Sequence, residues 1–160
     1  MSTEQILSRV YLEQWQGIRQ LTCDYLDELK PSDLALKLPF PESQSLLNQF
    51  YCMVGAEESY LRELQHGEWQ GFSSSIADIQ AITPAIIKDH MREADKMMSD
   101  LLSTTDLTQK LSNGKPGYKV VQSIIEHEMH HHGQLINFMY CHKFPIPQSW
   151  FLKWHLTRDE

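Results

Sequence analysis

Four stretches of the sequence carry apolar residues at intervals of three and four, the spacing that lines one side of an α-helix. They are about 4–29, about 45–64, a stretch from Pro84 to at least Leu101, and one that follows residues 113–117 and ends near Cys141. The segments between them are rich in Pro, Gly and Ser, and no alternating pattern typical of a strand competes with them. We therefore predict an all-α chain, a four-helix bundle that forms one domain over residues 1–160.

Local signals mark where these helices begin and end. Pro31 follows the first stretch, and Gly67 follows the second. Thr83 is suited to cap a helix that has Pro84 in its first position. Beyond the fourth stretch, Trp150, Phe151 and Trp154 make the C-terminal segment too aromatic for a solvated tail. We expect this segment to pack across the bundle or against a partner.

Charge and composition exclude several classes of partner. The chain has 14 Lys and Arg against 21 Asp and Glu, a net charge of −7, and no basic run that could follow a phosphate backbone. Nucleic acid and anionic membrane surfaces are therefore not expected partners. The sequence shows neither a signal-like apolar start nor an apolar span of membrane length, so we expect a cytoplasmic protein. Three widely spaced cysteines without a CxxC motif favour free thiols in a reducing compartment.

Four of the eight histidines fall within six positions of the last helical stretch. His127 and His131 are four residues apart, so on a helix they project from one face, one turn from each other. They share that face with apolar residues such as Ile124 and Phe138, and the spacing is that of a helical pair of metal ligands. The alternative is a pair of core histidines bonded to neighbouring residues. His130 and His132 point away from this face, so we expect them in solvent or at an interface.

The same segment satisfies the HExxH pattern of zinc peptidases, with Glu128 in the position of the general base. Two observations argue against a peptidase. Gly133 follows His131 by two residues rather than three, and the extension with a third histidine is missing. The sequence also predicts no strand that could hold an extended peptide.

A family resemblance covers most of the chain. The run HEMHHHGQLINFMYCHKFPIPQSW resembles the last helix and exit of the DinB/YfiT-like superfamily of small four-helix proteins, and residues 46–61 are similar to its second helix. The resemblance implies a metal site with two histidines from the last helix, here His127 and His131, and a third histidine from the second helix. Cys52 occupies that third position, and a thiolate is a good zinc ligand. Two interpretations stay open: a Cys52, His127 and His131 site for a divalent ion, zinc before nickel or iron, or a site that has decayed.

Two further polar residues of this helix are candidates for supporting roles. Glu128 could orient a ligand, act as a catalytic residue that accepts a proton from bound water, or form a surface ion pair. Gln134, one turn beyond His131, could contact a ligand residue or a substrate, or make a structural hydrogen bond.

The resemblance implies a metal-dependent enzyme that acts on a small molecule, either as a transferase that uses a low-molecular-weight thiol or as a hydrolase. The alternative is a non-catalytic dimeric helical protein with a vestigial or structural metal site.

The last helical stretch has a second apolar face. Ile125, Met129, Ile136 and Tyr140 lie opposite the face that turns toward the bundle. Soluble monomers rarely leave such a stripe in water, so either the aromatic tail or a second copy should cover it. We expect a two-fold homodimer through this face.

Overall fold

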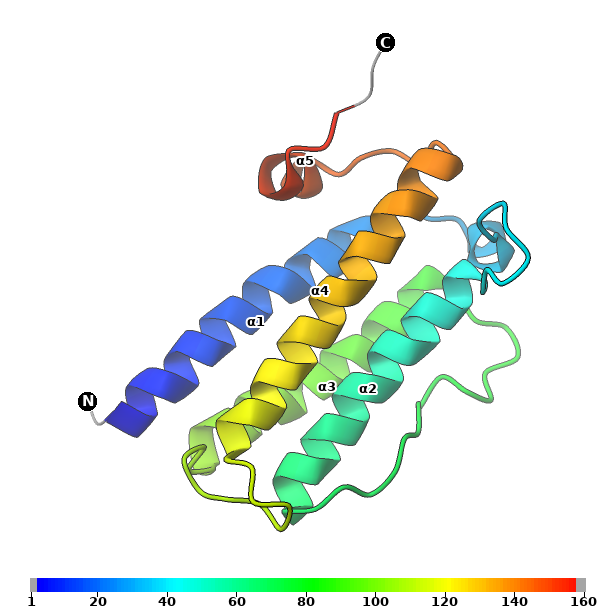
Figure 1. Ribbon diagram of the computed structural model, residues 1–160. Coiled ribbons are helices and arrows are strands. Elements are labelled where there is room, and N and C mark those ends of the chain that lie inside the picture. The colour runs from blue at the N-terminus through cyan, green and yellow to red at the C-terminus, as the bar shows by residue number, and fades with distance from the viewer. Residues whose placement is uncertain (1–2, 158–160) are drawn as a thin grey trace.

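In the computed structural model, which describes residues 3–157, four long helices lie side by side and two short ones flank them (Figure 1). The helices are α1 (Thr3–Asp27), η1 (Pro31–Ala35, a 3-10 helix), α2 (Leu46–His66), α3 (Pro84–Thr104), α4 (Gly117–Cys141) and α5 (Gln148–Trp154). The only β-structure within residues 3–157 is two isolated bridges. No helix in the same range is both long and apolar enough to cross a membrane. The predicted all-α four-helix bundle is confirmed.

The residues that we predicted to mark the ends of α2 and α3 lie at helix ends in the structure. Thr83 Oγ1 accepts a hydrogen bond from the Ile86 N–H at 3.2 Å, with Pro84 as the first residue of α3. Ser45 caps α2 in the same way, and α2 ends at His66, just before Gly67, whose φ of 76° favours a residue without a side chain. The starts of α2 and α3 and the end of α2 therefore lie where local residues suit a helix end.

The apolar core falls into two clusters, one toward each end of the bundle. The cluster near α5 includes Tyr25, Phe50 and Trp150, and the cluster at the opposite end includes Trp15, Leu61 and Met98. On α1, α2 and α4 a polar residue lies between the two clusters in the order of the chain, and on α3 a polar residue directly follows Ala94 of the cluster that includes Trp15. These residues are Arg19 on α1, Glu57 on α2, Asp95 on α3 and Glu128 on α4.

The aromatic C-terminal segment packs on the bundle, as expected. In Figure 1, α5 lies beside the C-terminal halves of α1 and α4. Trp150 is fully buried, and its indole N–H donates to the backbone oxygen of Leu21 at 2.6 Å. Ser149 donates to Asp24 at 2.5 Å. One aromatic ring and two hydrogen bonds thus fix α5 against α1.

The second apolar face of α4 is narrower than the sequence predicted. Ile125 is only 3% exposed because α1 covers it in the core cluster that includes Trp15, and Ile136 is partly buried against the other cluster. Met129 and Tyr140 are the exposed members, at 38% and 42%. The prediction that all four side chains face outward was wrong, because α1 and α4 lie close enough to bury the flank of this stripe.

Candidate metal centre

Two helices bring the predicted ligand residues together. His127 and His131 extend from α4 with their ring centroids 4.6 Å apart, and Cys52 extends from α2. One donor atom from each lies within 4.8 Å of the other two. Cys52 lies close to the two histidines because α2 packs against α4, and this packing is more extensive than that of α1 against α4. This Cys/His/His group, referred to below as the ligand group, could hold a metal ion.

The spacing of the donors fits a zinc ion. The Cys52 Sγ and His127 Nε2 atoms are 3.6 Å apart. A tetrahedral zinc ion with bonds of about 2.3 Å to sulfur and about 2.1 Å to nitrogen separates two such donors by about 3.6 Å. The distance between this one pair of donors is therefore that of two ligands of a zinc ion.

Gln49 orients the third ligand. His131 Nδ1 lies 2.8 Å from Gln49 Oε1, so the ring donates its Nδ1 proton to the amide oxygen and keeps a lone pair on Nε2. An acceptor on the far ring nitrogen is the usual device that fixes a metal-binding histidine. The sequence analysis missed this residue, although Gln49 precedes Cys52 by three positions and so lies on the same side of α2.

Burial sets the protonation of the ligand group. It lowers the pKa of His127, and it lowers the pKa of His131 to about 4, so both rings are neutral donors at neutral pH. Burial also raises the pKa of the Cys52 thiol. A metal ion must therefore displace a proton from Cys52 when it binds.

The other two histidines of α4 differ from each other. His130 is exposed and lies within 2.9 Å of the Gln134 side-chain nitrogen. His132 is completely buried, with Nε2 2.8 Å from Thr22 Oγ1 and its ring 4.7 Å from that of Trp150. The expectation that His132 would lie in solvent or at an interface was therefore wrong. It lies on the α1 side of α4, which α1 and α5 cover.

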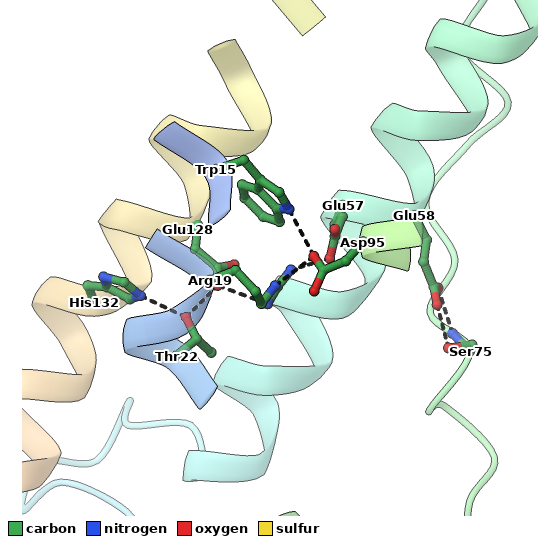
Figure 2. Close-up of polar contacts among 9 residues, drawn as sticks. All are labelled: Trp15, Arg19, Thr22, Glu57, Glu58, Ser75, Asp95, Glu128 and His132. Atoms are coloured by element: carbon green, nitrogen blue, oxygen red, sulfur yellow. Dashed lines mark hydrogen bonds and ion pairs between the residues drawn. The ribbon is translucent and has the colours of Figure 1, made fainter. Parts of the chain in front are cut away.

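Glu128 lies outside the ligand group, in the polar layer between the two core clusters (Figure 2). Its Oε1 atom accepts from Arg19 at 2.9 Å and from Thr22 at 2.5 Å, and its side chain is 2% exposed. The interpretation of Glu128 as part of a surface ion pair was wrong, since the ion pair is buried. Its catalytic role stays a prediction.

The polar layer joins all four long helices through Arg19. The guanidinium of Arg19 binds Glu57, Asp95 and Glu128, and Asp95 also accepts from the Trp15 indole at 2.8 Å (Figure 2). Burial opposes the charge on Arg19, but the three carboxylates outweigh it and raise the pKa of the guanidinium. Burial raises the pKa of Glu57 well above its ordinary value, and the nearby carboxylates of Asp95 and Glu128 raise it further, while Arg19 acts in the opposite direction.

The fold and the site together define the class of protein. It is a four-helix bundle that has a Cys/His/His group between α2 and α4. No protein-family model matches the sequence, and neither does any curated protein. The solved structures that share the fold include those of two DinB-like proteins. The one from Bacillus cereus is 21% identical, with a TM-score of 0.69 over 86% of this chain and 93% of that one. The one from Bacillus subtilis is 14% identical, with a TM-score of 0.68 over 88% of this chain and 96% of that one. The chain therefore has the fold of DinB-like proteins.

Proposed function

We propose that this protein is a metal-dependent enzyme that binds a divalent ion through Cys52 Sγ, His127 Nε2 and His131 Nε2. The observation that carries the proposal is the 3.6 Å separation of the Cys52 and His127 donors, next to a His131 ring that Gln49 already orients. A mixed sulfur and nitrogen set favours zinc over harder ions, with nickel or iron as alternatives.

The proposed reaction is transfer or hydrolysis on a small molecule. Cys52, His127 and His131 would hold the ion and leave one coordination position open, and the ion would supply the polarisation of a thiol or a water molecule there. The residues of the chain supply the rest: two neutral imidazoles, a thiol that ionises on binding, and an amide that prevents one imidazole from rotating. The nucleophile that we favour is a low-molecular-weight thiol, whose sulfur would form a bond to an electrophilic carbon of the small molecule while a leaving group departs with the electrons of the broken bond. The proposed activity is therefore that of a thiol S-transferase.

We further propose a cytoplasmic location. Cys23, Cys52 and Cys141 are all free, which suits a reducing compartment where Cys52 stays available as a ligand.

We also propose that two copies associate as a homodimer. The exposed side chains of Met129 and Tyr140 on α4 remain as the candidate contact.

Metal analysis of protein purified without a histidine tag tests the proposed function. After zinc loading and desalting we expect about one zinc ion per chain. His127→Ala should lose it, whereas His130→Ala, which removes an exposed imidazole from the same helix, should keep it. If the protein binds one zinc ion per chain and its helical circular dichroism spectrum is unchanged after chelation, the result favours a metal-dependent enzyme. If the protein unfolds after chelation, the result favours a structural metal site. Absence of zinc under every loading condition would contradict both.

A further inference from the structure

A cavity of about 560 Å³ adjoins the ligand group. It lies between residues 38–44, referred to below as the wall segment, the start of α2 and the second half of α4. Gln49 connects the cavity to the ligand group, because it lines the cavity and also lies 2.8 Å from His131 Nδ1. Small-molecule sites have volumes of about 300–1,000 Å³. A molecule whose reacting group binds the proposed metal ion therefore has room for the rest of its structure in this cavity.

The backbone of the wall segment has a fixed course. An isolated antiparallel bridge joins Lys37 to Ser45, so the two ends of the segment lie together. Between them, the Ser43 N–H donates to the Phe40 oxygen at 3.1 Å, and the hydroxyl of the buried Ser43 accepts from the Leu38 N–H at 2.8 Å. The cavity is therefore preformed on this side, and Phe40 has a defined position in its wall.

Phe40 presents apolar surface to this cavity. It lines the cavity and is 51% exposed. None of the other exposed large apolar residues within residues 3–157 lines the same cavity. A hydrocarbon group of a bound molecule that covers the Phe40 ring removes the apolar surface of both from water, which favours binding.

The other accessible apolar side chains of the lining are neighbours of Phe40. Pro39 is exposed and Leu38 is partly buried, whereas Phe138 on the opposite wall is only 1% exposed and offers little surface. The remaining described residues of the lining carry an amide, a hydroxyl, a carboxylate or a thiol. Apolar contact in the cavity is therefore concentrated at residues 38–40.

The proposed metal ion would attract the polar end of a ligand. A divalent ion bound by one thiolate and two neutral imidazoles leaves a net positive charge at the ligand group. An anionic or polar reacting group would therefore bind at the ion. Among the described residues, Glu42 is the one charged residue that lines the cavity, and it is exposed. The cavity thus combines a positive charge beyond Gln49 with apolar surface at residues 38–40.

We propose that Phe40 is a specificity-determining residue of the proposed enzyme. Its ring packs against an aliphatic or aromatic substituent of the electrophilic small molecule, while the reacting groups lie at the metal ion. The inference rests on the proposed function for the reaction, but the contact between Phe40 and a hydrocarbon group does not require the metal.

Primary alcohols of increasing length test this contact, because ethanol, 1-butanol and 1-hexanol share one uncharged head and differ only in hydrocarbon. The titration is made on the full chain with zinc and again after chelation. We expect 1-hexanol to shift the backbone amide NMR signals of Phe40, Glu42 and Gln44 in a saturable way. The affinity should increase about twofold to fourfold for each added CH₂ group.

Variants of Phe40 show whether this ring makes the contact. Phe40→Ala should weaken 1-hexanol binding about threefold to tenfold and reduce the gain for each CH₂ group, whereas Phe40→Leu should keep most of the affinity. Phe151→Ala is the matched control, because Phe151 is 44% exposed but lies on α5, outside the cavity. This variant should bind 1-hexanol as the wild type does.

The two proposals can fail separately. An affinity that does not increase with hydrocarbon length, shifts that map away from the wall segment, or equal binding by Phe40→Ala and the wild type would overturn the inference even if zinc binds. The expected pattern in a protein that never binds zinc would support the Phe40 contact and overturn only the proposed metal-dependent function.

Discussion

Among single residues, Gln49 has the most specific role beyond the ligands themselves. It makes no bond to the metal in our proposal, but it fixes which nitrogen of His131 keeps the lone pair. We expect Gln49→Leu to weaken zinc affinity about 10-fold to 100-fold, as the loss of such supporting residues usually does. Competition with a chromophoric chelator would measure it.

The conservative variant separates orientation from packing. In Gln49→Glu a carboxylate oxygen can still accept the His131 Nδ1 proton, so zinc affinity should stay close to that of the wild type. If Gln49→Leu binds zinc as tightly as the wild type, His131 does not need this partner.

Cys52 determines which metal the site prefers. Replacement by alanine removes one of three protein ligands and should weaken zinc binding, whereas Cys52→His exchanges a soft donor for imidazole. We expect Cys52→His to bind zinc and to increase the affinity for nickel or iron relative to zinc, measured by loading with equimolar mixtures and metal analysis. Identical selectivity in the wild type and Cys52→His would show that the sulfur is not a ligand.

At the scale of helices, the sequence predicted most of the architecture because the information is local. Apolar spacing indicates a helix wherever it occurs, and Thr83, Pro84 and Gly67 mark ends within a few residues of where they act. The ligand pair of α4 was predictable for the same reason, since four residues separate His127 from His131.

The polar layer was not predictable, because its members lie far apart in the sequence. Arg19 and Glu128 are 109 positions apart, and the pattern within either helix does not indicate a partner on the other. Only the packing of four helices shows that their charges meet in the interior. The burial of His132 escaped prediction similarly, since it depends on Trp150 of α5, a helix that the apolar spacing did not indicate.

The polar layer makes stability depend on pH. Folding buries Glu57 and raises the pKa of its carboxyl well above the ordinary value of 4.5, so the folded state favours the protonated form. The stability that Glu57 contributes is therefore fully present below about pH 4.5 and is lost as pH rises through its folded pKa.

The variant Glu57→Gln tests this dependence, since its side chain remains neutral while it still accepts from Arg19. We expect it to gain stability relative to the wild type as pH rises, by up to about 1.4 kcal/mol for each unit by which folding raises the pKa. Urea unfolding at about pH 5 and about pH 8 measures the difference. A difference that is the same at both pH values would mean that folding does not shift the pKa of Glu57.

At the scale of the whole molecule, the bundle consists of two apolar ends separated by a polar layer, with the ligand group on its α2 and α4 side. A contact between two copies through α4 must involve the residues of this helix that remain exposed. Ile125 and Ile136 are buried or partly buried within one chain, so charges there would test folding rather than assembly.

We expect the wild type to sediment as a dimer at micromolar concentration and Met129→Glu with Tyr140→Glu to sediment as a folded monomer. Phe40→Glu also removes an exposed apolar side chain, but it lies outside α4 and should leave the dimer intact. A wild-type monomer at all accessible concentrations would remove the dimer from the proposal.

X-ray absorption at the zinc edge tests the proposed metal centre most directly, because it reports the kind of donor atom and its distance. For zinc-loaded wild-type protein we predict one sulfur at about 2.3 Å and two imidazole nitrogens at about 2.0–2.1 Å, with one further light atom. Cys52→Ala should lose the sulfur and keep the imidazoles. A wild-type spectrum without sulfur, or one without imidazole nitrogens, would contradict the assignment of Cys52, His127 and His131 as the metal site.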